Sequence, residues 1–177
     1  VVATLFYRLP KGPEGFVRDV SAGIFGLGYL FVMGVVVMMM LKPEDGPWRI
    51  VAFIGCTVVS DIGGYAAGVL FGKHPLAPKI SPKKSWEGLA GSVLASVLFG
   101  VFVFSYGLDS HWWVGVFFGI LCALVGTLGD LCESLIKRDL GIKDMGNLLP
   151  GHGGIMDRLD SLLIVAPVAF VVLYVLV

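Results

Sequence analysis

Four aspartates, two lysines, two arginines and a histidine lie together between Lys137 and Ser161, in a chain that is otherwise apolar. Carboxylates can hold a divalent cation, and cationic side chains can neutralise phosphate oxygens. Asp157 and Asp160 lie one helical turn apart at the start of a hydrophobic run, with Arg158 between them. Charges at a helix entrance are common by themselves, so the neighbouring residues decide whether this segment is a reaction centre.

Glycines precede that hydrophobic run. Gly151, Gly153 and Gly154 flank His152, and glycines at a helix N-terminus let backbone N–H groups approach a phosphate. We expect His152 to shape this turn or to donate a hydrogen bond to phosphate, rather than to act as a general base. The turn is therefore a candidate phosphate-binding element.

A second basic segment, KHPLAPKISPKK, lies earlier, at residues 73–84. Its four lysines and three prolines predict a stiff basic loop, and Ser85 after it is a plausible N-cap of the next helix. The functional interpretation is a clamp for a polyphosphate, with Lys79, Lys83 and Lys84 as its cations. The alternative is a topology signal that also contacts anionic lipid headgroups.

Asp61 lies in the middle of an apolar run, within VVSDIGGYAAG. On insertion scales a carboxylate at the centre of a membrane helix costs about 3 kcal/mol, so such residues usually face a polar cavity. The alternative is a helix–helix hydrogen bond, with Ser60 or Tyr65 as the partner.

Asp130 lies at the end of another apolar run, in TLGDLCESLIKRD. At helical spacing it shares a face with Thr127, Ser134 and Lys137, and Glu133 lies at the edge of that face. Taken alone, this pattern is typical of the solvated face of a helix that leaves a membrane.

Membrane-spanning helices must position these residues. The chain is 56% hydrophobic and 15% charged, with a mean hydropathy of +0.88, whereas soluble domains carry about 25% charged residues. A spanning helix needs roughly 20 apolar residues, and five runs suggest one: Val20–Leu41, Trp48–Phe71, Leu89–Tyr106, Trp112–Leu131 and Leu159–Val177. The sequence therefore predicts an all-α, polytopic integral membrane protein with about five transmembrane helices.

Lysine and arginine are concentrated in alternate loops. The segment before the first run and the loops at 72–88 and 132–158 are basic, whereas the loop GLDSHWW has no Lys or Arg. The positive-inside rule places the basic segments on the cytoplasmic side. Both basic loops are therefore expected to border one polar cavity that faces the cytoplasm.

The residue types disfavour some functions and favour one. A formal net charge of zero gives no indication of a nucleic-acid partner. The sequence has no Ser–His–Asp pattern, and its three cysteines form no CxxC pair, which disfavours a zinc site. Carboxylates with many Lys and Arg suit phosphoryl or nucleotidyl transfer with Mg²⁺. An attacking phosphate, with a second pKa of about 6, needs no general base.

Two stretches resemble a known family. Residues Ser134–Asp160, SLIKRDLGIKDMGNLLPGHGGIMDRLD, resemble the signature of the phosphatidate cytidylyltransferases (CDP-diacylglycerol synthases) over their whole length. Residues Ser60–Gly88 are similar to that family's second conserved stretch, with Ile62 where Thr is common. The family usually has further N-terminal spans, and the opening VVATLF looks like the end of one. We therefore expect residues 1–177 to be the C-terminal catalytic membrane domain.

The resemblance implies an enzyme of phospholipid biosynthesis that makes CDP-diacylglycerol and pyrophosphate from CTP and phosphatidate. It implies Mg²⁺, with K⁺ at a paired site. It also implies a homodimer whose funnel-shaped cavity opens to the cytoplasm and the bilayer. The expected location is a bacterial-type inner (plasma) membrane, with membrane lipids as partners and the active site facing the cytoplasm.

The resemblance also implies roles for individual residues. Asp130 and Asp157 match the family's metal-binding carboxylates, and we expect Asp160 or Asp61 to complete the metal shell. The expected catalytic residues are Asp130, Asp157, Lys84 and Arg158. The expected substrate-binding residues are Lys79, Lys83, Ser85, Lys137, Arg138, Lys143, Asp144, His152, Gly153 and Gly154.

Two alternatives stay open. A CTP-dependent kinase of a lipid alcohol would pass a γ-phosphoryl group to polyprenol or phytol and release CDP, and its acceptor would benefit from a base. An ion-coupled transporter would use Asp61 and Asp130 as intramembrane cation sites, but it would not need the HGG and KISPKK elements.

Overall fold

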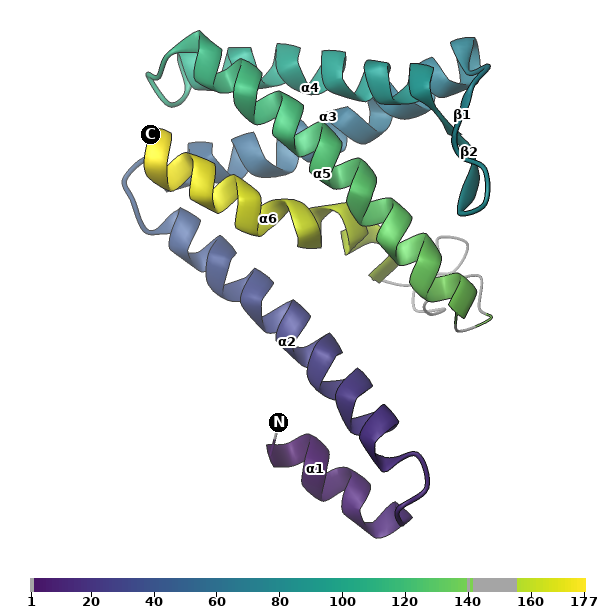
Figure 1. The fold of residues 1–177 in the computed structure, drawn as a ribbon. Helices are drawn as coiled ribbons and strands as arrows, with labels where there is room; N and C mark the ends of the chain where they lie inside the picture. The colour runs from purple at the N-terminus through teal and green to yellow at the C-terminus, as the bar shows by residue number, and fades with distance from the viewer. Residues whose placement is uncertain (1, 140, 142–155) are drawn as a thin grey trace.

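A computed structural model describes residues 2–139, 141 and 156–177, without the side chains of residues 11 and 156–160. A short helix α1 (Val2–Arg8) and a 3₁₀ turn η1 (Leu9–Lys11) precede the long helices α2 (Phe16–Leu41) and α3 (Gly46–Phe71). Two strands follow, β1 (Pro75–Ala77) and β2 (Ser81–Ser85), and then α4 (Trp86–Tyr106), α5 (Trp112–Asp139) and α6 (Met156–Leu176) (Figure 1).

The long helices confirm the predicted all-α membrane architecture. In the described part of the chain, α2, α3, α4 and α5 are each long and apolar enough to cross a membrane. The fifth run forms α6, whose described apolar portion, Ser161–Leu176, is shorter. Helix α4 begins at Trp86, three residues before the predicted start, and α5 continues to Asp139, eight residues past the predicted end.

Helices α3 to α6 form the body of the protein, in which α4 packs against both α3 and α5, and α6 packs against α5 (Figure 1). Hydrogen bonds reinforce the contact between α3 and α4. The hydroxyl of Ser92 donates to the carbonyl oxygen of Ser60 at 2.9 Å, and that of Ser96 donates to the carbonyl oxygen of Cys56 at 3.1 Å. Small residues at the contact between membrane helices let the backbones approach closely enough for such bonds.

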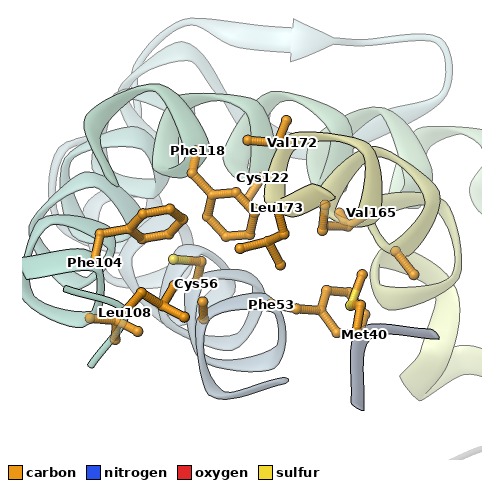
Figure 2. Close-up of a cluster of buried hydrophobic side chains, with 14 of the residues drawn as sticks. Met40, Phe53, Cys56, Phe104, Leu108, Phe118, Cys122, Val165, Val172 and Leu173 are labelled. Atoms are coloured by element: carbon orange, nitrogen blue, oxygen red, sulfur yellow. The ribbon is translucent and has the colours of Figure 1, made fainter. Parts of the chain in front are cut away.

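The apolar core lies at one end of this bundle. Phe53 is near the start of α3, Phe104 near the end of α4 and Phe118 near the start of α5, and all three are buried. The rings of Phe104 and Phe118 have centroids 5.1 Å apart, and Figure 2 shows them converging with Cys56 and Leu173. The buried apolar side chains are concentrated at this end of the bundle. The polar residues of the site lie at the other end, beside the strands.

An arginine ties the first and last helices of the bundle together at the core end. The guanidinium of Arg49 in α3 donates to the carbonyl oxygen of Leu173 in α6 at 2.9 Å, and also pairs with Asp45 at 2.9 Å. It therefore satisfies a carbonyl at the C-terminal end of α6, where helices leave such groups unpaired.

Helix α2 diverges from the bundle, and α1 folds back along its far end (Figure 1). Much of the apolar surface of α2 is exposed, including Phe25, Phe31 and Met38, whereas Met33 and Met40 are buried. Arg8 is buried in the turn between the two helices, where it pairs with Asp19 at 2.9 Å.

The basic segment after α3 is a hairpin, so the prediction of a loop was wrong. Strands β1 and β2 pair antiparallel, with Pro75 opposite Ser85 and Ala77 opposite Ser81. Proline cannot donate to a ladder and is confined to edges, but a two-stranded sheet consists only of edges. The three prolines therefore do not prevent pairing.

Candidate functional site

A cavity of about 670 Å³ opens where the hairpin meets α3, α4 and α5. Its lining combines small residues, two lysines and two aspartates: Asp61, Gly64, Tyr65, Gly68, Val69, Leu76, Ser81, Lys83, Lys84, Ser85, Gly88, Leu89, Ser92, Thr127 and Asp130. Elements separated in the sequence thus bring together two of the four carboxylates and two of the three clamp lysines that the sequence singled out. Lys79, in the hairpin turn, is exposed and lies outside the described lining.

An ion pair between Lys84 and Asp130 lies in the lining of this cavity. The ammonium of Lys84 donates to Oδ2 of Asp130 and lies 3.4 Å from the carbonyl oxygen of Thr127. Their side chains are 25% and 28% exposed, so the pair is accessible from the cavity. Both residues were expected in the site, but their pairing with each other was not predicted.

Asp61 joins α3 to α6 beside the same cavity. Its Oδ2 accepts a hydrogen bond from the hydroxyl of Ser161 at 3.3 Å, across 100 residues of sequence. The predicted partners were Ser60 or Tyr65. The carbonyl oxygen of Ser60 accepts a separate hydrogen bond from Ser92. Both interpretations of Asp61 therefore hold in part, because the residue lines the cavity and also makes a helix–helix hydrogen bond.

Ser85 begins α4 as predicted. Its extended backbone (φ −123°, ψ 159°) and its hydroxyl, which accepts from the Gly88 N–H at 3.1 Å, make it the N-cap. The cap fixes the end of β2 directly after Lys83 and Lys84, so the backbone that carries both lysines is anchored to the helix.

Glu87 holds the base of the hairpin, and the sequence analysis missed it. Its carboxylate accepts the N–H groups of Lys73 and His74 at 3.2 and 3.3 Å, and lies 2.6 Å from Nδ1 of His74. The N–H of Trp86 donates to the carbonyl oxygen of His74 at 3.0 Å. An acidic residue in the first turn of a helix was the available signal, because that position favours a carboxylate.

The C-terminal end of α5 carries two basic residues, Lys137 and Arg138. Lys137 pairs with Glu133 at 2.9 Å along the helix, and Arg138 is exposed. The predicted polar face is thus divided, with Thr127 and Asp130 in the cavity and Lys137 paired beyond it. The other predicted site residues lie outside the described residues or side chains: Lys143, Asp144, His152, Gly153, Gly154, Asp157, Arg158 and Asp160.

The cavity has donors that suit a hard cation. In the described part of the chain, no three His, Cys, Asp or Glu residues gather as a metal cluster. Asp61 and Asp130 nevertheless line one space, and Mg²⁺ commonly binds through one or two carboxylates, waters and substrate phosphates. Two carboxylates and an open cavity therefore fit such an ion.

Comparisons with known proteins show the family of this chain. A family model described as "Cytidylyltransferase family" matches residues 1–176. Phosphatidate cytidylyltransferases of Mycobacterium bovis and Mycobacterium leprae are each 47% identical, over 91% and 90% of this chain and 53% and 51% of their own lengths. One from Helicobacter pylori is 45% identical over 78% of this chain and 49% of its own length. The chain spans about half the length of the curated relatives it matches.

Proposed function

Since this chain belongs to the cytidylyltransferase family, we propose that it takes part in transferring the cytidylyl group of CTP to phosphatidate, forming CDP-diacylglycerol and pyrophosphate. The observation that carries the proposal is one cavity, at the hairpin end of apolar helices, lined by Lys83, Lys84, Asp61 and Asp130. Similar proteins named phosphatidate cytidylyltransferase support the choice of substrates.

The position of the cavity suits a reaction between a lipid and a soluble nucleotide. Asp130 lies eighteen positions after Trp112 in α5, a rise of about 27 Å at 1.5 Å per residue. The hydrocarbon core is about 30 Å thick, and tryptophans favour its boundaries. With Trp112 at one boundary, Asp130 lies close to the other, at the depth of lipid phosphates. The basic hairpin is on the same side, which favours the cytoplasmic face of a bacterial plasma membrane.

The chemistry needs charge neutralisation more than proton transfer. An oxygen of the phosphatidate phosphate attacks the α-phosphorus of CTP, the bond to the β-phosphate oxygen breaks, and pyrophosphate leaves. The attacking phosphate is largely deprotonated at neutral pH. Lys83 and Lys84 neutralise the polyphosphate, which is the main requirement of phosphoryl-type transfer.

A divalent cation completes the site in this proposal. When bound, Mg²⁺ supplies positive charge that stabilises the phosphate oxygens in the transition state. Asp130 and Asp157 would hold it, with Asp61 or Asp160 as a further ligand. K⁺ at a paired site, a homodimer, surrounding membrane lipids and the roles of Lys79, Lys137, Arg138, Lys143, Asp144, Arg158 and the HGG turn stay proposals that rest on the family resemblance.

Pyrophosphate release tests the function. The membrane-embedded protein should release pyrophosphate from CTP when phosphatidate is present and not when it is omitted, and Asp130→Asn should lose most of this activity while remaining folded. Formation of CDP with a lipid alcohol would instead support a kinase. Cation flux without CTP binding would support a transporter.

A further inference from the structure

The ammonium of Lys84 has the surroundings of a bound cation. It contacts a carboxylate oxygen of Asp130 and the carbonyl oxygen of Thr127, the latter at 3.4 Å. These two oxygens come from residues three apart on α5, so they lie on one helical face. Carboxylate and carbonyl oxygens are also the ligands that hard metal ions take. The lysine therefore donates to the same oxygens that a metal ion at Asp130 would take as ligands.

The charges of the cavity are balanced in this arrangement. Its described charged side chains are two carboxylates, Asp61 and Asp130, and two ammonium groups, Lys83 and Lys84. A divalent cation that bound Asp130 in the absence of nucleotide would displace the Lys84 ammonium from the carboxylate. The displaced ammonium would then lie next to the double positive charge of the cation, without a carboxylate of its own. A nucleotide changes this balance, because its phosphates accept the displaced ammonium and also bind the cation.

The side chain of Lys84 can move while its backbone stays fixed. Residue 84 precedes the N-cap Ser85, and Glu87 holds the base of the hairpin. Lysine carries its charge on a flexible four-carbon stem, and this one is 25% exposed toward the cavity. The ammonium can therefore exchange Asp130 for a phosphate without a rearrangement of the hairpin.

From these three observations we propose that Lys84 occupies Asp130 until the nucleotide arrives, so that the divalent cation binds together with CTP and only weakly without it. This inference rests on the proposed function for the identity of the nucleotide. It adds an order to the binding events that the family assignment does not contain. Because linkage is reciprocal, the cation strengthens nucleotide binding by the same factor by which the nucleotide strengthens cation binding.

Mn²⁺ binding to the nucleotide-free protein tests the proposal. Electron paramagnetic resonance of free Mn²⁺ would be titrated against detergent-solubilised wild type, Lys84→Met, Lys84→Arg and Lys83→Met. A neighbouring charge changes the proton affinity of a carboxylate by about 1–3 pKa units, so Lys84→Met should bind Mn²⁺ at least about tenfold more tightly. Lys84→Arg keeps the charge and should resemble wild type. Lys83→Met removes a lysine of the same cavity and should change the affinity by less than about threefold.

Two further variants locate the effect and protect the test from misfolding. Adding Asp130→Asn to Lys84→Met should abolish the gain, because the tighter site would lose its carboxylate. Thermal unfolding of each variant identifies any that fails to fold, and Lys84→Gln then replaces Lys84→Met. Equal or weaker Mn²⁺ binding by a folded, charge-free variant at position 84 would overturn the proposal.

Nucleotide binding gives an independent readout. Retention of radiolabelled CTP, without phosphatidate, should increase with Mn²⁺ by a larger factor in wild type than in Lys84→Met, and equal factors would overturn the proposal. These measurements need no turnover, so they separate the two conclusions. Wild-type protein that shows the Mn²⁺ pattern but releases no pyrophosphate would retain the role of Lys84 and reject the proposed function.

Discussion

Gly91→Ala in α4 tests whether the close approach of α3 and α4 holds the site. A Cβ atom at position 91 would lie 2.7 Å from the carbonyl oxygen of Gly63 in α3, closer than the 3.0 Å below which real Cβ contacts essentially never occur. It would also meet the side chain of Ala67. The nearest atom is the Ala67 methyl group, which cannot rotate away, and the next is the backbone oxygen of Gly63, so the two helices must separate. Overpacking of this kind costs about 1–3 kcal/mol.

Helix propensity acts in the opposite direction, so matched controls are required. Replacing glycine by alanine within a helix stabilises it by roughly 0.5–1 kcal/mol. A Cβ at Gly26 or Gly28 in α2 would meet nothing within 4 Å, and these two residues lie on different faces of that helix. Gly26→Ala and Gly28→Ala therefore report the propensity alone, and Gly91→Ala should be about 1–3 kcal/mol less stable than they are.

Thermal unfolding in detergent measures this difference. For a chain of this size, 1 kcal/mol shifts Tm by about 2–4 °C, so Gly91→Ala should unfold about 2–12 °C below the two controls. Its activity should fall as well, because Gly88 and Ser92 of the same helix line the cavity. A Tm equal to that of Gly26→Ala and Gly28→Ala would refute the inferred contact between the helices.

Further predictions concern the site itself. Glu87→Ala should lower kcat/KM for CTP by about tenfold, because a displaced hairpin misplaces Lys83 and Lys84. Glu87→Gln still accepts N–H groups and should retain more activity. Steady-state kinetics of both variants would show this difference, and equal losses would contradict the prediction. Lys83→Ala should raise the KM for CTP more than that for phosphatidate, whereas a lysine that only contacts headgroups would leave the CTP dependence unchanged. His152→Gln should retain measurable turnover and His152→Ala less; complete loss in both would indicate a general base, which pH–rate profiles would reveal. Chelation by EDTA should stop pyrophosphate release, and added Mg²⁺ should restore it.

Local sequence patterns predicted the elements better than their contacts. Apolar runs predicted the long helices because the bilayer sets their length, and Ser85 was predicted as an N-cap because capping depends on adjacent residues. The hairpin was missed because its lysines and prolines lack the alternating apolar pattern of a half-buried strand, and its strands pair only with each other.

Partners distant in the sequence could not be predicted from composition or spacing. The pairs Lys84–Asp130 and Ser161–Asp61 span 46 and 100 residues, and each depends on how α5 or α6 packs against the rest. Charge complementarity alone allows several basic residues to be the ion-pair partner of Asp130. The three-dimensional arrangement is needed to identify Lys84 as that partner. Asp61 was placed correctly in a polar cavity because the cost of a membrane carboxylate is independent of its partner.

The arrangement of the contacts has a consequence for how the protein is made. Helix α3, the β1–β2 hairpin and α4 are consecutive in the sequence. Helices α3 and α4 can therefore pack together as soon as residues 46–106 have left the ribosome. The Lys84 ion pair must wait for α5, and the links from Ser161 to Asp61 and from Arg49 to Leu173, the latter across 124 residues, must wait for α6. Assembly can therefore begin with the α3–α4 pair, and the contacts of the cavity's charged side chains are completed last. A nascent chain that ended before α6 would retain the contact between α3 and α4 but lack the hydrogen bond from Ser161 to Asp61.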